Sequence, residues 1–166
     1  MKVLVPVDGS QAALAALLHV GSLSHSGVAV ETLLLNVQPR FHRHVSRFTS
    51  RAARDSLRAE RSAAAMAPAI ETLSRTRLPF RAVSELGNVA ERIAAVAERE
   101  QVDEIMMGVG RHPQWLRWIN PSIAHGVIAR TDIPVGVLAR GQAGLLERYA
   151  LPAGVAGIAA LLLSAE

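Results

Sequence analysis

The chain has 166 residues, which suits a single domain, and half of its residues are hydrophobic, enough for a substantial core. It contains no cysteine, which excludes disulfides, thiolate metal sites and cysteine nucleophiles. The formal net charge of +4 is concentrated in residues 40–61, where seven arginines stand against Asp55 and Glu60. The N-terminus lacks a signal-peptide pattern because its apolar run stops at Asp8, so the expected location is the cytoplasm.

Short β-rich runs alternate along the chain with longer alanine-rich segments of helical spacing. The first helix is expected to begin after Ser10, a good N-cap, and to end near Gly21. A later helix is expected to begin at Asn88, because Glu91 follows it at capping-box spacing. The runs predict strands at residues 2–7, 28–37, 80–86, 104–109 and 133–138.

This alternation predicts an α/β fold with a single open sheet of five parallel strands and helices on both faces. The runs at 2–7 and 104–109 are nearly all apolar, which is typical of strands buried on both faces. The predicted domain covers residues 1–140. Residues 141–166 form an apolar C-terminal tail that is expected to be helical.

Two loops at the carboxyl ends of predicted strands are candidates for a ligand site, which in open parallel sheets lies at that edge. They are "VDGS" after the first strand and "GVGR" after the fourth. An aspartate that ends a buried strand is costly unless it caps a helix, pairs or faces a ligand. Asp8 therefore has two open interpretations, a ligand contact or a tight turn into the helix.

Four stretches, in order along the chain, carry a family resemblance. They read "KVLVPVDGS", "LLLNVQP", "GNVAERIAAVAEREQVDEIMMGVG" and "IPVGVLAR". Together they are similar to the universal stress protein family over about residues 1–140. The resemblance implies a five-stranded parallel sheet of the adenine nucleotide α-hydrolase-like type. It also implies a homodimer paired through the last strand, here residues 133–138.

Some members of that family bind ATP through a loop of Gly, two residues, Gly, nine residues, Gly and then Ser or Thr. Glycines let backbone amides close on phosphates, and the hydroxyl adds a donor at a helix N-terminus. Gly108 and Ser122 fit the first and last positions, whereas Arg111 and Pro121 stand where the second and third glycines belong. The spacing is kept and two of the three glycines are missing.

The two replacements leave alternatives open. Arg111 either blocks the phosphate pocket or replaces the missing amides with its guanidinium. Pro121 has no backbone N–H, although it suits the first turn of a helix capped by Asn120. The expectation is weak or no ATP binding, with Mg²⁺ present only if ATP binds, and the alternative is an ATP or AMP sensor in which Arg111 substitutes for a loop glycine.

The resemblance also implies which residues would line a nucleotide site. Val7 and Asp8 would lie at the adenosine end, with Val37 beside the base. The phosphate and ribose side would be lined by Gly108, Gly110, Arg111, Ser122 and Ile123. No catalytic residue is assigned, because Ser122 has no evident activating base and no nucleophile–base arrangement occurs. The chain is therefore not expected to be an enzyme, or at most a weak ATP hydrolase.

Trp115 and Trp118 are three residues apart and would share one helix face. They either pack on the last helix or the dimer partner, or serve as anchors for a protein partner.

The arginines from Arg40 to Arg61 recur every three or four residues. This spacing is consistent with either a solvated helix face or an anion-binding surface. No nucleic-acid motif accompanies them, so nucleic acid is not an expected partner, and His42 and His44 lack the further ligands that a metal needs.

Residues 149–165 carry no charge, but Pro152 leaves only 13 residues up to Ala165. A membrane span needs about 20. The tail is expected to dock on its own domain or on the dimer partner, with peripheral membrane contact as the lesser alternative. The expected function is a homodimeric regulatory or binding module of the stress response, and the second alternative is an adaptor that binds a membrane or an acidic partner through the arginines and the tail.

Overall fold

The computed structural model describes residues 1–40, 50–76, 78–110 and 120–139. All five strands are parallel, in the order β3-β2-β1-β4-β5. Helices cover both faces of this sheet, so the predicted fold class is confirmed. The elements are β1 (Lys2–Pro6), α1 (Gln11–His25), β2 (Glu31–Gln38), α3 (Arg51–Thr76), β3 (Phe80–Leu86), α4 (Val89–Arg99), β4 (Glu104–Val109), α5 (Asn120–Ile128) and β5 (Val135–Ala139).

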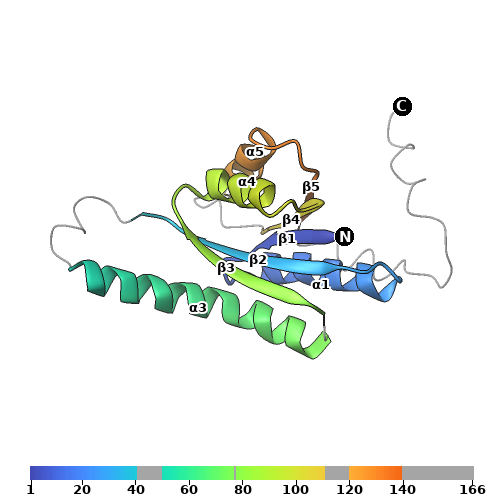
Figure 1. Ribbon diagram of the computed structural model, residues 1–166, viewed down its shortest axis with the longest axis horizontal. Helices are drawn as coiled ribbons and strands as arrows, with labels where there is room; N and C mark the ends of the chain where they lie inside the picture. The colour runs from blue at the N-terminus through green and yellow to red at the C-terminus, as the bar shows by residue number, and fades with distance from the viewer. Residues whose placement is uncertain (41–49, 77, 111–119, 140–166) are drawn as a thin grey trace.

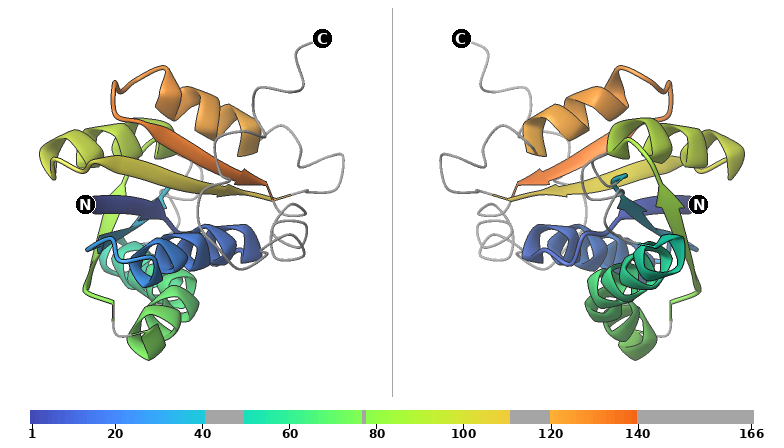
Figure 2. Two further views of the ribbon diagram at one scale, coloured as in Figure 1. Left: turned by 90° about the vertical axis from the view of Figure 1, so that its right-hand side faces the viewer. Right: turned by 90° about the vertical axis from the view of Figure 1, so that its left-hand side faces the viewer.

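Two hydrophobic cores lie on opposite faces of the sheet. Helices α1 and α3 cover one face, and α4 and α5 cover the other (Figure 1, Figure 2). Successive side chains of a strand point to opposite faces, so Val3 and Val5 pack toward α1 and α3 while Leu4 packs toward α4. This double burial explains why the β1 and β4 sequences are nearly continuous apolar runs.

Both predicted helix caps are present. The Ser10 hydroxyl accepts a hydrogen bond from the Ala13 N–H at 3.2 Å, and the Asn88 side chain accepts one from the Glu91 N–H, also at 3.2 Å. The predicted end of the first helix near Gly21 is wrong, because α1 continues to His25. Gly21 is buried inside the helix, and the chain turns only at Gly27, whose φ of +91° suits glycine.

Two strands begin later than the sequence predicts. β2 begins at Glu31 rather than at residue 28. The Glu31 N–H donates a hydrogen bond to the Met1 carbonyl at 2.9 Å. β5 begins at Val135 rather than at residue 133, because the Ile133 N–H is engaged in a turn by the Thr131 hydroxyl at 3.2 Å. The apolar, β-branched residues Val28, Val30 and Ile133 lie just before these strands, and their strand-like composition made the predicted strands too long.

The connections define where a ligand site belongs. β1 leads into α1 on one face of the sheet, whereas its neighbour β4 is followed by α5 on the other face. Adjacent strands whose connections leave toward opposite faces create a crevice at their carboxyl ends. The end of β1 and the end of β4 carry the two loops that the sequence singles out.

Helix α3 is much longer than the sheet it covers. Its buried residues are Ser62, Ala69 and Leu73, so its first eleven residues bury none. In Figure 1 this amino-terminal part reaches past the carboxyl ends of β2 and β3. Four of the seven arginines of residues 40–61 lie on this part: Arg51, Arg54, Arg58 and Arg61.

Candidate functional site

A cleft opens between the carboxyl ends of β1 and β4, on the side covered by α4 and α5. It has a volume of about 140 Å³. Its walls are mainly apolar and come from β1, β2, β4, α1, α4 and α5. The lining residues are Pro6, Val7, Asp8, Ala13, Leu35, Val37, Val89, Ile93, Met107, Gly108, Val109 and Ile123. The site therefore lies at the topological switch point of the sheet.

Five of the eight predicted site residues line this one cleft: Val7, Asp8, Val37, Gly108 and Ile123. Gly110 follows β4 and is half-buried, but it is not among the residues that line the cleft. Ser122 lies within α5, where its side chain is outside the described residues, and Arg111 is outside them altogether.

Asp8 forms a turn and also lines the cleft. Its Oδ1 accepts a hydrogen bond from the Ser10 N–H at 2.9 Å, and the intervening Gly9 has a φ of +82°. A Cβ on Gly9 would come within 3.3 Å of the Ala65 Cα, so the turn also lies against α3. The two interpretations of Asp8 are thus compatible: the carboxylate shapes the loop and remains exposed at the mouth of the cleft.

Gly108 is required by packing. A Cβ at this position would overlap the carbonyl group of Ala12 and would lie 2.8 Å from the Ala13 nitrogen, because the end of β4 presses directly on the first turn of α1. These are backbone atoms, which cannot move aside as a flexible side chain can. The glycine at the first loop position therefore has a structural reason to be present with or without a phosphate ligand.

Asn36 is a residue of this site that sequence reasoning misses. Its side chain is only 2% exposed. Its amide nitrogen donates to the Val7 carbonyl at 2.6 Å, and its amide oxygen accepts from Gln38 Nε2 at 2.8 Å. Asn36 thereby fixes the backbone where β1 enters the cleft. The available signal was a polar residue inside the otherwise apolar run "LLLNV".

Part of the apolar wall of the cleft belongs to the hydrophobic core. Val89 and Ile93 lie on the inward face of the amphipathic helix α4, and they also line the cleft. Leu35 and Met107 contribute in the same way from β2 and β4. Helical and strand periodicity identifies which residues face inward, but it does not separate those that pack on each other from those that border a cleft.

A network of ion pairs lies at the opposite edge of the sheet. Glu100, just after α4, pairs with Arg81 of β3 and with Lys2 of β1, whose Nζ lies 3.3 Å from its carboxylate. The hydrogen bond from Arg81, helped by Lys2, holds the pKa of Glu100 below its ordinary value. The same hydrogen bond raises the pKa of Arg81.

Two kinds of site are not found in the part of the chain that the structure describes. No group of three or more His, Asp or Glu side chains there could hold a metal ion. None of the helices described is both long and apolar enough to cross a membrane.

The model of the universal stress protein family matches residues 1–139. Among solved structures, the hypothetical protein MJ0577, whose biochemical function was assigned from its structure, is 28% identical with a TM-score of 0.67, over 84% of this chain and 95% of that one. No curated protein matches the chain.

Two further structures share the fold and hold ligands. A universal stress protein family member from Arabidopsis thaliana with AMP bound is 14% identical, with a TM-score of 0.64 over 87% of this chain and 94% of that one. A universal stress protein in complex with cAMP is 18% identical, with a TM-score of 0.60 over 83% and 96%. The family match spans all five strands, and the chain therefore belongs to the universal stress protein family.

Proposed function

We propose that this chain is a non-catalytic regulatory module of the stress response whose cleft holds the adenosine part of an adenine nucleotide and grips the phosphates weakly. The observation that carries the proposal is the gathering of Val7, Asp8, Val37, Gly108 and Ile123 around one cleft at the switch point of the sheet. These residues come from four separate parts of the chain.

The chemistry of the cleft suits adenosine. The partly exposed apolar side chains of Val37, Val89 and Val109 offer surfaces to a flat base, and the exposed Asp8 carboxylate can accept a hydrogen bond from a ribose hydroxyl. The AMP-bound and cAMP-bound proteins of the same fold support an adenine nucleotide as the ligand class.

The phosphate side is weakened by the sequence. Pro121 removes a backbone donor where a glycine would supply one, and Arg111 places a long side chain at another glycine position. Gly108 adds little to the case for phosphate binding, because packing alone requires it. Most of the binding free energy should therefore come from the nucleoside, with Mg²⁺ contributing little.

Calorimetric titration with adenosine, AMP and ATP, each with and without Mg²⁺, tests the proposal. We expect the three ligands to bind within a few-fold of one another. Restoring glycine at both positions (Arg111→Gly with Pro121→Gly) should strengthen ATP binding by at least about tenfold, roughly 1.4 kcal/mol, and leave adenosine binding unchanged. The absence of any nucleotide binding would overturn the proposal.

The same titration decides between the two roles of Arg111. If Arg111 substitutes for a loop glycine, wild-type protein will prefer ATP to adenosine strongly, and Arg111→Gly alone will remove that preference. That outcome would replace the weak-phosphate account with the ATP or AMP sensor. Loss of ATP binding in Arg111→Gly is the decisive measurement, because a blocking arginine predicts a gain.

We also propose that the module is a homodimer paired through β5. β5 lies at the edge of the sheet, and Val137 on it is 46% exposed. An exposed apolar edge strand is a natural pairing surface. Light scattering should report a dimer that Val137→Arg converts to a monomer. Ile128→Arg, a matched change at another exposed aliphatic residue, should leave the dimer intact, and a monomeric wild type would refute the assignment.

A second candidate function is an adaptor for an acidic protein or an anionic membrane. The observation that favours it is the amino-terminal part of α3, which buries no side chain before Ser62 and carries four arginines. Co-sedimentation with anionic vesicles that falls steeply as salt rises would support it. The other parts of this candidate, Trp115, Trp118 and the tail 141–166, lie outside the described residues, so the predicted domain boundary at residue 140 stays a prediction.

A further inference from the structure

A second cavity lies on the other face of the sheet, between α3 and the carboxyl ends of β2 and β3. Its volume is about 420 Å³, three times that of the cleft. Sites for small molecules usually measure a few hundred Å³, so the cavity is large enough for one. The side chains that matter here are Gln38, Arg58, Ser62, Met66, Ser84 and Leu86.

The contact between helix and strand at this cavity is polar. Ser62 of α3 and Ser84 of β3 share a hydroxyl–hydroxyl hydrogen bond of 2.8 Å, and Ser62 is only 4% exposed. Farther along α3, the buried contacts are made by Ala69 and Leu73, as is usual for a helix packed on a sheet. Whichever serine donates, the other hydroxyl keeps one hydrogen that it can offer to a bound molecule.

The cavity also has a positive side. Arg58 lines it with a side chain that is 23% exposed, and its guanidinium pairs with the more exposed Asp55 at 2.8 Å. Glu85 lines the cavity too, but its carboxylate pairs at 3.0 Å with Arg99 of α4, on the opposite face. Arg58 is therefore the cation that lines the cavity, while the Glu85 carboxylate is held by a partner on the other face, and this arrangement favours an anionic guest.

We propose that this cavity binds a small molecule that carries an oxyanion, either a carboxylate or a phosphate. The planar guanidinium of Arg58 matches both groups, and the free hydroxyl hydrogen of the serine pair adds a neutral donor. Met66 and Leu86 offer an apolar wall to the remainder of the guest. The site is separate from the nucleotide cleft, and its occupancy does not depend on nucleotide binding.

Titrations of ¹⁵N-labelled protein with acetate, inorganic phosphate and glycerol test the proposal. Acetate or phosphate should give saturable shifts of the Ser62 and Ser84 amide signals, and the stronger of the two identifies the source of the oxyanion. Glycerol, which is neutral, should give none. Equal shifts with glycerol, or no saturable shift with either anion, would overturn the proposal.

Matched variants locate the binding. Arg58→Gln and Arg51→Gln each remove one ion pair with Asp55, but only Arg58 lines the cavity. Arg58→Gln should weaken anion binding at least tenfold, and Arg51→Gln should leave it unchanged. Ala63→Met, which fills the cavity, should abolish binding, whereas Ala64→Met on the neighbouring exposed position should not. Equal binding by Arg58→Gln and wild type would exclude this site.

Discussion

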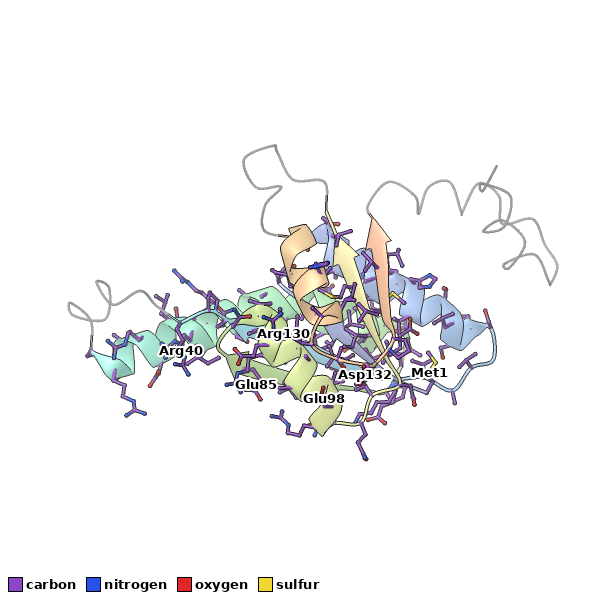
Figure 3. The ribbon with its side chains drawn as sticks, turned by 90° about the horizontal axis from the view of Figure 1, so that it is seen from above. Met1, Arg40, Glu85, Glu98, Arg130 and Asp132 are labelled. Carbon is purple, nitrogen blue, oxygen red and sulfur yellow. The ribbon has the colours of Figure 1, made fainter. Side chains whose placement is uncertain are left out.

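The two edges of the sheet differ in how their charged side chains are paired. At the amino-terminal edge, Lys2, Arg81 and Glu100 join two strands and the end of a helix. Figure 3 shows Met1 and Asp132 at this edge and Arg40 at the far one. At the carboxyl edge, Asp8 is exposed, and its carboxylate accepts a hydrogen bond from the N–H of Ser10, within its own loop.

This difference separates stability from binding. At the amino-terminal edge, the ion pairs of Glu100 with Lys2 and Arg81 connect the end of α4 to β1 and β3, so they stabilise the packing of this helix on the sheet. Among the described residues, the Asp8 carboxylate at the other edge is held by its own turn, and it can still accept hydrogen bonds. Three substitutions should sharpen or break this contrast, since each acts on stability or on binding at one edge.

The largest effect should come from Gly108→Ala. The added Cβ would overlap the backbone of Ala12, so β4 or α1 must shift, at a cost of about 3 kcal/mol in the free energy of unfolding. Gly136→Ala is the matched control on β5, because there the Cβ meets the flexible end of Met106 at 2.6 Å and should cost less. Urea denaturation compares the two, and a loss below about 0.5 kcal/mol in Gly108→Ala would contradict the packing argument.

Glu100→Gln should have an intermediate effect that depends on pH. Because the pKa of Glu100 is lower in the folded chain than its ordinary 4.5, its ionised form stabilises the fold above that value. We expect a lower melting temperature for the variant than for wild type at pH 7. The difference should shrink as the pH falls below 4.5 through the lower folded pKa.

Glu98→Gln serves as the control, because Glu98 is an exposed glutamate in the last turn of α4, two residues before Glu100, and is labelled in Figure 3. Its melting temperature should follow that of wild type at every pH. Raising the salt concentration should narrow the gap between Glu100→Gln and wild type, since the pairs are partly exposed. A gap that persists unchanged at low pH would mean that the charge of Glu100 is not its cause.

Asp8→Asn should have the smallest effect on stability. Asparagine can keep the hydrogen bond to the Ser10 N–H, so the free energy of unfolding should change by less than about 0.5 kcal/mol. Adenosine affinity should nevertheless fall several-fold, because the charged acceptor for a ribose hydroxyl is lost. Calorimetry measures both quantities, and unchanged affinity would remove Asp8 from the proposed site.

The sequence predicted the fold because alternating strand and helix periods admit few topologies, and because Ser10 and Asn88 are strong local caps. It misplaced the end of α1, since a buried glycine inside a helix looks the same in sequence as one that ends it. The family resemblance identified Val7, Asp8 and Val37, which line the cleft, but not Asn36, which holds the Val7 carbonyl behind it. Periodicity predicts which face of the sheet a residue occupies. It does not predict that the Asn36 amide reaches the Val7 carbonyl, because that contact depends on how the two strands lie side by side.

The close approach of β4 and α1 at Gly108 has a consequence for how family patterns are interpreted. A chain that lost its nucleotide would still be selected to keep this residue, because any replacement would disturb the fold first. The first glycine of the loop pattern therefore indicates the fold. Its presence is not separate evidence that a nucleotide binds. Of the three glycine positions, only the second and third, which are Arg111 and Pro121 in this chain, can report on phosphate binding.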